Sequence, residues 1–407
     1  MQIYRLENVI QPYAWGSKTA IAQMIGQPNP AKQPQAELWM GTHPKGPSMA
    51  ISGDDRVALQ QLIDRQPSDI LGQYVVGRFG QALPYLFKVL AAAQPLSIQA
   101  HPSKSEAIEG FDRENREGKA LDAPDRNYRD ASHKPEIICA LTPFWGLNGF
   151  RPPAEAVRLL MPVCPHDLDD AFQDLKTRQD HGLRFFFEAM MTLSEDKRKA
   201  AAQEVLHKAG PLADTSPLYR WMVDLARVYP VDMGILSPAL LTLICLEPGQ
   251  AMYLRAGQLH AYLDGVGIEL MANSDNVLRG GLTPKHVDVP ELLSVVRFEE
   301  TKIKILVPKP VGPAESGYDC PAEEFSLTVI RPPKSRPYVS PAIRNVEMLL
   351  CTAGEGSIED GGQGVCLSMK KGDSFLIPAG IQSSTIGGNV IVYKASVPLP
   401  HQYTLDS

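Results

Sequence analysis

The sequence predicts a mainly β protein with an α-helical insertion. Three observations predict it: short strand-like segments fill two separated stretches, helical spacing fills the stretch between them, and a glycine-based turn frame recurs in both β regions. The 407 residues exceed what one hydrophobic core usually serves, so two or three domains are expected.

The first β region has two parts. Over residues 1–150, short apolar segments alternate with proline and glycine, as in PYLFKVLAAAQPLSIQAHP and EIICALTPFWGLNGF. The same texture returns in ALLTLICLEPGQAMYLRAGQLHAYL. We therefore expect residues 1–150 and 236–307 to form one central β domain.

Helical spacing characterises residues 151–235. Apolar side chains share one face at Leu183, Phe186, Phe187 and Met190, and another at Leu218, Trp221, Met222 and Leu225. Ser216 followed by Pro217 is typical of a helix start. These residues predict an inserted helical domain.

In residues 308–407 apolar and polar residues again alternate, as in CLSMKKGDSFLIPAG, which predicts a second β domain.

A repeated frame relates the two β regions. Gly249 is followed after five residues by Arg255-Ala-Gly and, two residues later, by His260. This matches a motif of cupin jelly rolls except that Arg255 replaces proline. The C-terminal copy begins at Gly372 and has Ser383 in place of the histidine. We therefore expect two cupin-like jelly rolls, of which the second has no metal.

Composition limits the possible partners and location. A formal charge of −6 gives no electrostatic reason to expect nucleic acid or an anionic membrane. Met1–Trp15 lacks the features of a signal peptide, and the longest apolar stretch, around Ile235–Leu246, contains Pro238. A cytoplasmic protein is expected. The six cysteines include no CxxC pair and are expected to be small buried residues.

Four side chains form a candidate metal site. Ser97, Gln99 and His101 alternate as on one face of a strand, and Glu136 and His260 lie in other strand-like segments. Two imidazoles, a carboxylate and an amide oxygen suit Zn²⁺, with Fe²⁺, Mn²⁺ or Co²⁺ as alternatives. Spacing alone leaves structural roles open for all of them.

Two long segments carry a family resemblance. NYRDASHKPEIICAL, residues 127–141, and HAYLDGVGIELMANSDNVLRGGLTPK, residues 260–285, resemble the two signatures of type I phosphomannose isomerases. QPYAWGS, AELWMGTHPKGPS and LPYLFKVLAAAQPLSIQAHP add to the likeness, which is colinear over residues 11–307. Two positions depart from the family pattern: Ser132 replaces an asparagine and Gly280 an alanine.

The resemblance implies a function. It places one zinc ion per chain on Gln99, His101, Glu136 and His260, in a central catalytic cupin domain. The implied activity interconverts D-mannose 6-phosphate and D-fructose 6-phosphate through a cis-enediol, so the partner is a small phosphorylated sugar. A monomer is expected.

The proton-transfer group has several candidates. Glu269 is the first, and Asp275, Lys134 and His133 compete with it. Arg279 is a plausible stabiliser of the enediolate because a guanidinium keeps its charge. Alternatively, Glu269 is a structural carboxylate paired with Arg279, and Asp275 caps a turn.

The resemblance also implies residues that hold the substrate. Ser97, Lys88 and Lys285 match phosphate-binding positions, and Trp15 and Tyr262 are expected to form pocket walls. The alternative roles are solvated lysines and core aromatics, although Lys88 lies in an apolar run where an unpaired ammonium is costly.

Two rival functions stay open. A metal-dependent cupin oxygenase would use His101, Glu136 and His260 to hold Fe²⁺. A non-catalytic cupin would bind the sugar phosphate without converting it. The other histidines are assigned to the surface or to packing: His43, His166, His181, His207, His286 and His401.

Overall fold

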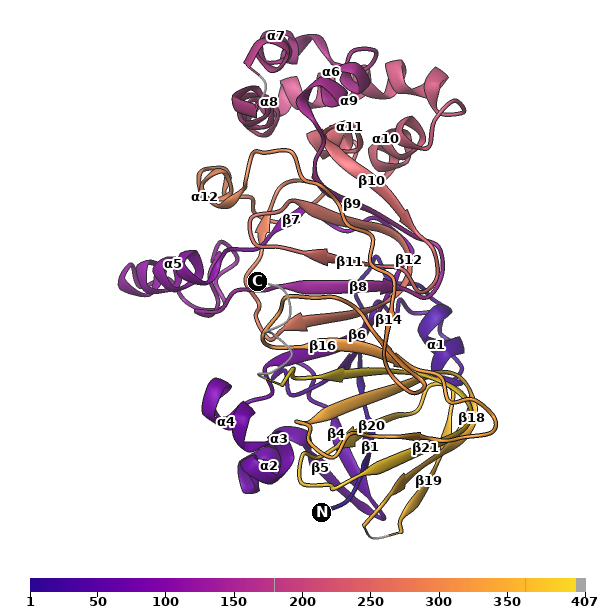
Figure 1. Cartoon of the computed structure of the whole chain (residues 1–407). Coiled ribbons are helices and arrows are strands. Elements are labelled where there is room, and N and C mark those ends of the chain that lie inside the picture. Colours follow the sequence, from indigo (N-terminus) through magenta and orange to yellow (C-terminus); the bar gives the residue numbers. More distant parts are fainter. Residues whose placement is uncertain (179, 363, 400–407) are drawn as a thin grey trace.

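A computed structural model describes residues 1–178, 180–362 and 364–399 of the chain. Their strands form two sheets, and most of the helices lie beyond one end of the first sheet (Figure 1). The predicted fold class, mainly β with an α insertion, is confirmed. His401 and the rest of the expected domain beyond residue 399 lie outside the described residues.

The first sheet has ten strands. In hydrogen-bonded order its main path is β10 (Leu241–Leu246), β9 (Phe144–Phe150), β12 (His260–Ala272), β6 (Tyr85–Ala92), β3 (Glu37–Met40) and β2 (Val9–Gln11). Four short strands pair beside this path: β7 (Gln99–Ala100), β8 (Glu136–Ala140), β11 (Ala251–Leu254) and β13 (Leu278–Arg279). All residues of β6 are buried, which explains why every residue in it except Lys88 is apolar or aromatic.

Strand β12 changes partners along its length. Its first residues pair with β7 and β9, and the stretch from Gly265 to Ala272 pairs with β6 and β8. The register shifts between Tyr262 and Asp264, and Gly265 has φ +123°, where a Cβ would lie 2.7 Å from the carbonyl oxygen of Pro143. This bulge lies where β12 changes its pairing partners.

The second sheet has eleven strands. Its path is β14 (Lys309–Gly312), β15 (Glu315–Gly317), β16 (Ser326–Ile330), β21 (Ser384–Ser396), β18 (Glu347–Asp360), β20 (Ser374–Ile377), β1 (Tyr4–Glu7), β4 (Met49–Ser52) and β5 (Asp55–Ala58). Strand β17 (Tyr338–Val339) pairs with β21, and β19 (Cys366–Lys370) with β18.

Three N-terminal strands belong to this second sheet. The expectation that all of residues 1–150 joins the central sheet is wrong for β1, β4 and β5, because β1 pairs with β20 and β4. Leu6 and Ala50 on these strands bury their side chains in a core that also contains Phe87 and Met348. Burial in this shared core, which joins the two sheets, accounts for the pairing.

The helical insertion lies between β9 and β10, which pair with each other, so the chain leaves the sheet and returns beside the strand it left (Figure 1). It consists of α6 (Pro153–Leu160), η1 (His166–Leu168), α7 (Asp169–Arg178), α8 (Asp180–Thr192), α9 (Glu195–Ala209), η2 (Gly210–Leu212), α10 (Pro217–Val228), η3 (Met233–Leu236) and α11 (Ser237–Leu240). The predicted apolar face of α8 is buried, and Ser216 caps α10 by accepting from the amide of Leu218; Trp221 is only half-buried.

The remaining helices lie outside the insertion. They are α1 (Ala20–Ile25), α2 (Leu59–Arg65), α3 (Pro67–Leu71), α4 (Gln73–Phe79), α5 (Lys104–Arg116) and α12 (Val289–Val295). Helix α5 begins with a capping box between Ser103 and Glu106. No helix among the described residues is long and apolar enough to span a membrane.

The six cysteines are free. Cys139, Cys164 and Cys351 are buried as expected, Cys245 and Cys320 are half-buried, and Cys366 is exposed. The expectation of burial is wrong for Cys366 because it begins β19, a strand whose residues are mostly exposed.

Candidate functional site

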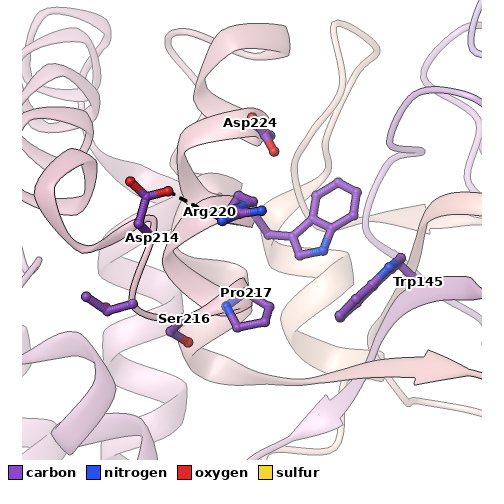
Figure 2. Close-up of a pocket in the computed structure, with 8 residues that line it drawn as sticks. Trp145, Asp214, Ser216, Pro217, Arg220 and Asp224 are labelled. Atoms are coloured by element: carbon purple, nitrogen blue, oxygen red, sulfur yellow. Dashed lines mark hydrogen bonds and ion pairs between the residues drawn. The ribbon is translucent and has the colours of Figure 1, made fainter.

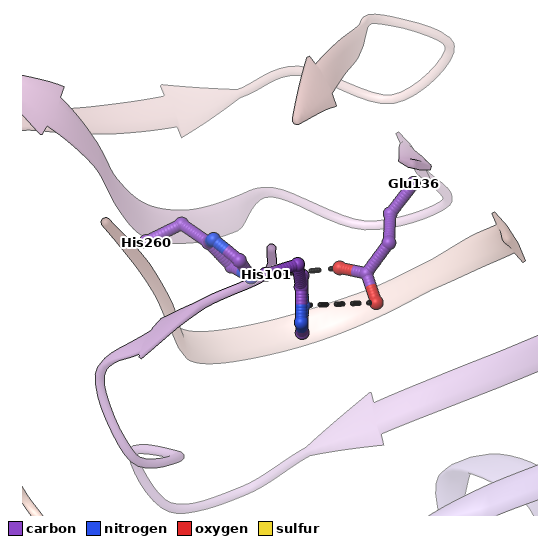
Figure 3. A group of neighbouring side chains, drawn as sticks. All are labelled: His101, Glu136 and His260. Carbon is purple, nitrogen blue, oxygen red and sulfur yellow. Dashed lines mark ion pairs between the residues drawn. The ribbon is translucent and has the colours of Figure 1, made fainter. Parts of the chain in front are cut away.

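His101, Glu136 and His260 form a buried cluster (Figure 3). Their side chains are 1%, 3% and 3% exposed. His101 Nε2 lies 3.4 Å from Glu136 Oε1, and His260 Nε2 lies 3.5 Å from Glu136 Oε2. Zinc bonds of about 2.1 Å in a tetrahedron give ligand-to-ligand separations of about 3.4 Å. The three donors therefore have the spacing of ligands around one ion.

Main-chain carbonyls fix the tautomers of both histidines. His101 Nδ1 lies 2.7 Å from the oxygen of Asn276, and His260 Nδ1 lies 3.0 Å from that of Gln258. A carbonyl only accepts, so both Nδ1 atoms donate and both Nε2 lone pairs face Glu136. His101 Nε2 is buried and has no hydrogen-bond partner among the described residues. This unpaired acceptor is what a metal ligand requires.

Electrostatics also favour metal binding. Burial, aided by the charge of Lys134, lowers the pKa of His101 to about 4, so its imidazole is neutral at physiological pH. Burial alone would raise the pKa of Glu136, but Lys134 and the two histidines bring it well below its ordinary value. A neutral imidazole beside a carboxylate is the form that binds zinc.

Gln99 lies beside this cluster. It stands directly opposite His260 of β12 on one side and Arg279 of β13 on the other. Directly opposed residues on antiparallel strands share a face, with Cβ atoms about 4.5–5.5 Å apart. The Gln99 amide nitrogen donates to Ser97 Oγ at 3.3 Å, which leaves its oxygen available. The expected longer strand from Ser97 to His101 is not formed, since β7 has only two residues.

The cluster opens into a narrow recess of about 60 Å³. Its polar lining consists of Glu37, Lys88, Ser97, Gln99, Lys134, Glu136, His260, Tyr262 and Glu269. A sugar-sized pocket usually exceeds about 300 Å³. The recess can therefore take only one end of a sugar.

Two lysines balance the carboxylates of the recess. Lys88 Nζ lies 3.0 Å from Glu269 and 3.7 Å from Glu37, and Lys134 Nζ lies 2.9 Å from Glu136. The alternative pairing of Glu269 with Arg279 is wrong, because Glu269 pairs with Lys88. Burial raises the pKa of Glu269 against the opposing effect of Lys88. A carboxyl group of raised pKa suits acid–base chemistry.

Tyr262 forms one wall of the recess. It is 5% exposed, its ring packs edge-on against Phe144, and its buried hydroxyl has no hydrogen-bond partner among the described residues. Burial raises its pKa well above the ordinary value. Trp15 is half-buried and packs against the apolar cluster behind Tyr262, stacked on Tyr13, so it supports this wall and does not line the recess.

A group of cations lies next to Gln99. Burial lowers the pKa of Arg279, and Arg129 lowers it further. The pKa of Lys285 is lowered by burial and then by Arg279 and Arg129. Within the described part of the chain, no acidic side chain forms an ion pair with Arg129, Arg279 or Lys285. Arg129 was missed at the sequence level, where its place in the segment 127–141 was the available signal.

The structure does not bring His133 and Asp275 into the recess. His133 Nε2 contacts Glu324 at 2.6 Å, in the segment that precedes β16. Asp275 pairs with Lys45 at 2.7 Å and with His43 at 3.3 Å. Burial would raise the pKa of Asp275, but these two partners bring it below its ordinary range. His43, which was assigned to packing or the surface, is thus a buried partner of Asp275.

Two other cavities involve the helical insertion. One of about 310 Å³ is lined by Trp145, by Trp221 and Pro217 of α10, and by Asp214 in the segment before this helix (Figure 2). The other, of about 680 Å³, is bordered by Lys285 and by residues of α8, α9 and the end of α10. The candidate metal ligands line neither of them.

A β scaffold with two imidazoles and one carboxylate converging at a buried point defines a metal-binding protein of the mononuclear kind. Residues 3–153 match the model of the type I phosphomannose isomerase catalytic domain. The chain is 41% identical over 388 residues to mannose-6-phosphate isomerase of Escherichia coli, covering 95% of this chain and 97% of that protein. It is 34% identical to the human enzyme of that name, covering 87% and 88%.

A solved structure gives the same result. The crystal structure of mannose 6-phosphate isomerase from Salmonella typhimurium, bound to fructose 6-phosphate and zinc, matches with a TM-score of 0.90 and 36% identity, covering 98% of this chain and 100% of that one. The chain belongs to the type I phosphomannose isomerase family, a family of isomerases.

Proposed function

We propose that the chain interconverts D-mannose 6-phosphate and D-fructose 6-phosphate with one zinc ion bound by Gln99, His101, Glu136 and His260. The observation that carries this proposal is the meeting of three of these donors, from distant parts of the sequence, at ligand spacing in a buried place. The fourth donor, Gln99, lies directly across from His260. The activity named for the relatives supports the choice of substrate.

The zinc ion, when bound, supplies a Lewis acid that polarises the sugar carbonyl and lowers the energy of negative charge on the sugar oxygens. The protein supplies the proton transfer. We assign the base to Glu269, because it is buried in the recess and burial raises its pKa. Lys134 is the second candidate, since its amino group also borders the recess and could accept a proton in its neutral form.

In the proposed reaction, a carboxylate in the recess removes the proton from C2 of mannose 6-phosphate while O1 takes up a proton, which gives a cis-enediol. O2 then releases its proton and C1 receives one, which gives fructose 6-phosphate. Arg279, directly across from Gln99, offers a guanidinium to the oxygens that become negative. Tyr262 and Ser97 border the same space and are proposed to contact the sugar.

The phosphate is proposed to bind outside the recess, where Lys285 and Arg279 form no ion pair with an acidic side chain of the described residues. The narrow volume of the recess supports this division of the substrate. Lys88 faces two carboxylates, so in our proposal it adjusts the charge of Glu269, and its predicted contact with phosphate stays a prediction.

The test is a coupled assay of mannose 6-phosphate conversion before and after chelation, with zinc add-back. We expect activity to be lost and then restored. His260→Ala should lose activity and bound zinc, whereas the exposed His207→Ala should keep both. Conversion that survives complete metal removal would refute the proposal.

The same preparation separates the rival functions. Turnover that consumes O₂ and requires Fe²⁺ would indicate an oxygenase. Binding of mannose 6-phosphate by the zinc-loaded protein without conversion would indicate a non-catalytic module.

A further inference from the structure

Trp39 lies in a row of side chains that crosses three neighbouring strands. It stands directly opposite Lys88 of β6, and Lys88 stands directly opposite Glu269 of β12. Directly opposed residues share one face of a sheet. Trp39 is 5% exposed and packs with Leu86 and Met271, outside the lining of the recess. Any effect of Trp39 on the recess is therefore indirect.

Trp39 contacts two charged side chains. Its indole nitrogen donates to Oε2 of Glu37, two residues earlier on β3. The Lys88 ammonium lies 5.5 Å from the centre of its ring, within the range of a cation–π contact. Glu37 and Lys88 both border the recess, and both are buried. Trp39 thus contacts two side chains of the recess without lining it.

Lys88 is shared unequally between two carboxylates. Its Nζ lies 3.0 Å from Glu269 Oε2, which is a hydrogen bond, and 3.7 Å from Glu37 Oε2, which is too far for one. The Glu37 oxygen nearest to Lys88 is the one that accepts from the indole. Among the described residues, this indole is the only hydrogen-bond donor to the Glu37 side chain. Without it, the buried Glu37 carboxylate would keep only Lys88 as a partner and would move toward it.

The indole is also restrained from outside the recess. The His43 ring packs edge-on against it, with ring centroids 4.7 Å apart. The main-chain amide of Lys45 donates to His43 Nδ1 at 3.3 Å, so the proton is on Nε2, which lies 3.3 Å from Asp275 Oδ1. Asp275 and His43 thus help to fix the position of Trp39, although neither lines the recess.

We propose that Trp39 is a positioning residue for the proton-transfer group. By holding Glu37 away from Lys88, its indole N–H leaves the Lys88 ammonium to Glu269 alone. The role of Glu269 as the base rests on the proposed function. The division of Lys88 between two carboxylates rests on the distances alone.

The charge of Glu269 depends on this division. The titratable groups that face it are Lys88 of β6, Glu37 of β3, Tyr262 of β12, Lys134 and Glu136. Burial raises the pKa of Glu269, Lys88 lowers it, and Glu136 and Glu37 raise it again. Loss of the indole donor would draw Lys88 toward Glu37 and so raise the pKa of Glu269. Loss of the Glu37 charge would lower this pKa, so the two changes have opposite signs.

The experiment compares Trp39→Phe, Glu37→Gln, the double variant and a control. Phenylalanine keeps an aromatic face for Lys88 and removes the N–H donor. The control is Trp145→Phe, because this half-buried indole lines a different cavity and makes no side-chain hydrogen bond within the described chain. Two quantities are measured on zinc-loaded protein: kcat against pH, and the pKa of Glu269 by NMR titration of ¹³C-labelled carboxyl groups, assigned with Glu269→Gln.

The ascending limb of kcat against pH reports ionisation of the base in the substrate complex. We expect this limb to move to higher pH in Trp39→Phe. At a pH below the wild-type limb, kcat should fall about three- to tenfold, and a higher pH should restore it. In Glu37→Gln the limb should move to lower pH. The double variant should resemble Glu37→Gln, because no second carboxylate then competes for Lys88. Trp145→Phe should leave the limb in place.

An unmoved limb and an unchanged pKa of Glu269 in folded Trp39→Phe would overturn the proposal. A double variant that keeps the shift of Trp39→Phe would also overturn it, because the indole would then act without Glu37. If Trp39→Phe fails to fold, Glu37→Gln still tests the competition for Lys88, and an unchanged pKa of Glu269 in that variant would contradict it. The NMR titration needs no turnover. Absence of isomerase activity would therefore refute the proposed function, and the pKa of Glu269 would still decide the role of Trp39.

Discussion

Lys88 and Glu269 stand directly opposite each other on β6 and β12, with Nζ 3.0 Å from Oε2. Glu37 is the second carboxylate beside the same lysine, and Glu136 pairs with Lys134 nearby. Three carboxylates against two ammonium groups leave one negative charge in the recess, before the metal is counted. A divalent ion both neutralises this charge and leaves the site positive enough to attract an anionic substrate.

The first prediction concerns Glu269. Glu269→Gln keeps the size of the side chain but removes its ability to accept a proton, so we expect kcat to fall by about 10²- to 10⁴-fold with bound zinc retained. Steady-state kinetics and metal analysis are the measurements. Glu37→Gln also removes a carboxylate beside Lys88, and it should lower kcat by a smaller factor. A loss below tenfold in Glu269→Gln would transfer the role of base to Lys134.

The second prediction concerns zinc and stability. A ligand that binds only the folded state, at 1,000 times its Kd, stabilises it by about 4 kcal/mol. Chelation should therefore lower the melting temperature of the wild-type protein, measured by calorimetry. Glu136→Gln, which lacks the carboxylate between the two histidines, should melt at the same temperature with and without chelator. A chelator effect of wild-type size in this variant would show that the ion binds elsewhere.

The third prediction concerns Lys285. Its exposed ammonium lies near Arg279 and has no acidic partner within the described chain, so Lys285→Ala should weaken binding of the phosphorylated sugar. We expect KM to rise about tenfold with a smaller change in kcat. Lys197→Ala, on the surface of the helical insertion, is the matched control. Equal Michaelis constants in wild type and Lys285→Ala would contradict a role in phosphate binding.

Periodic and local features could be predicted from the sequence. The buried face of α8 was predicted from the spacing of its apolar residues, because residues three or four positions apart lie on the same face of a helix. The candidate metal ligands His101, Glu136 and His260 were found because their residue types suit a metal and lie within long family segments. In both cases the signal is contained in a short stretch of chain.

Features that depend on distant partners could not be predicted. The texture of residues 1–150 predicts short strands, but the pairing of β1 with β20 is decided by where Leu6 finds apolar surface. Trp39 was missed for a related reason. A single indole has no periodic pattern, and its role follows from contacts with side chains that lie far away in the sequence, such as Lys88.

The fourth prediction concerns Gly280, a departure from the family pattern. Its φ is not in the left-handed region, and an added Cβ would meet the terminal methyls of Leu259 and Ile98 at 3.2 and 3.3 Å. Such methyls can shift by a few tenths of an ångström. Gly280→Ala should therefore raise the free energy of unfolding by about 0.4–1 kcal/mol, through the lower entropy of the unfolded chain. Denaturant titration measures this, and a loss of more than about 1 kcal/mol would show that the site is rigidly packed.

The fifth prediction concerns Lys394, a buried cation of the second sheet. Its ammonium lies 2.7 Å from Glu315 and 3.0 Å from Glu347. Burial alone would raise the pKa of Glu315, but Lys394 and the hydroxyls of Thr328 and Tyr338 bring it below its ordinary value. In Lys394→Met, Glu315 loses its cation and Glu347 keeps only Arg344, at 3.8 Å, so we expect a loss of about 3–5 kcal/mol in the free energy of unfolding at pH 7.

The contribution of Glu315 to the free energy of unfolding should depend on pH with opposite sign in the wild type and in Lys394→Met. In the wild type, the folded pKa of Glu315 lies below its unfolded value, so its contribution to stability is present at neutral pH and is lost as the pH falls through the folded pKa. In Lys394→Met the uncompensated burial raises the folded pKa above the unfolded value of about 4.3. The free energy of unfolding of the variant should therefore fall as the pH rises. The difference in this free energy between wild type and variant should be smaller at pH 5 than at pH 7.5. Denaturant titrations at both pH values, with the exposed Lys371→Met as control, make the comparison. An equal difference in free energy of unfolding at both pH values would mean that Glu315 does not depend on Lys394 for its charge.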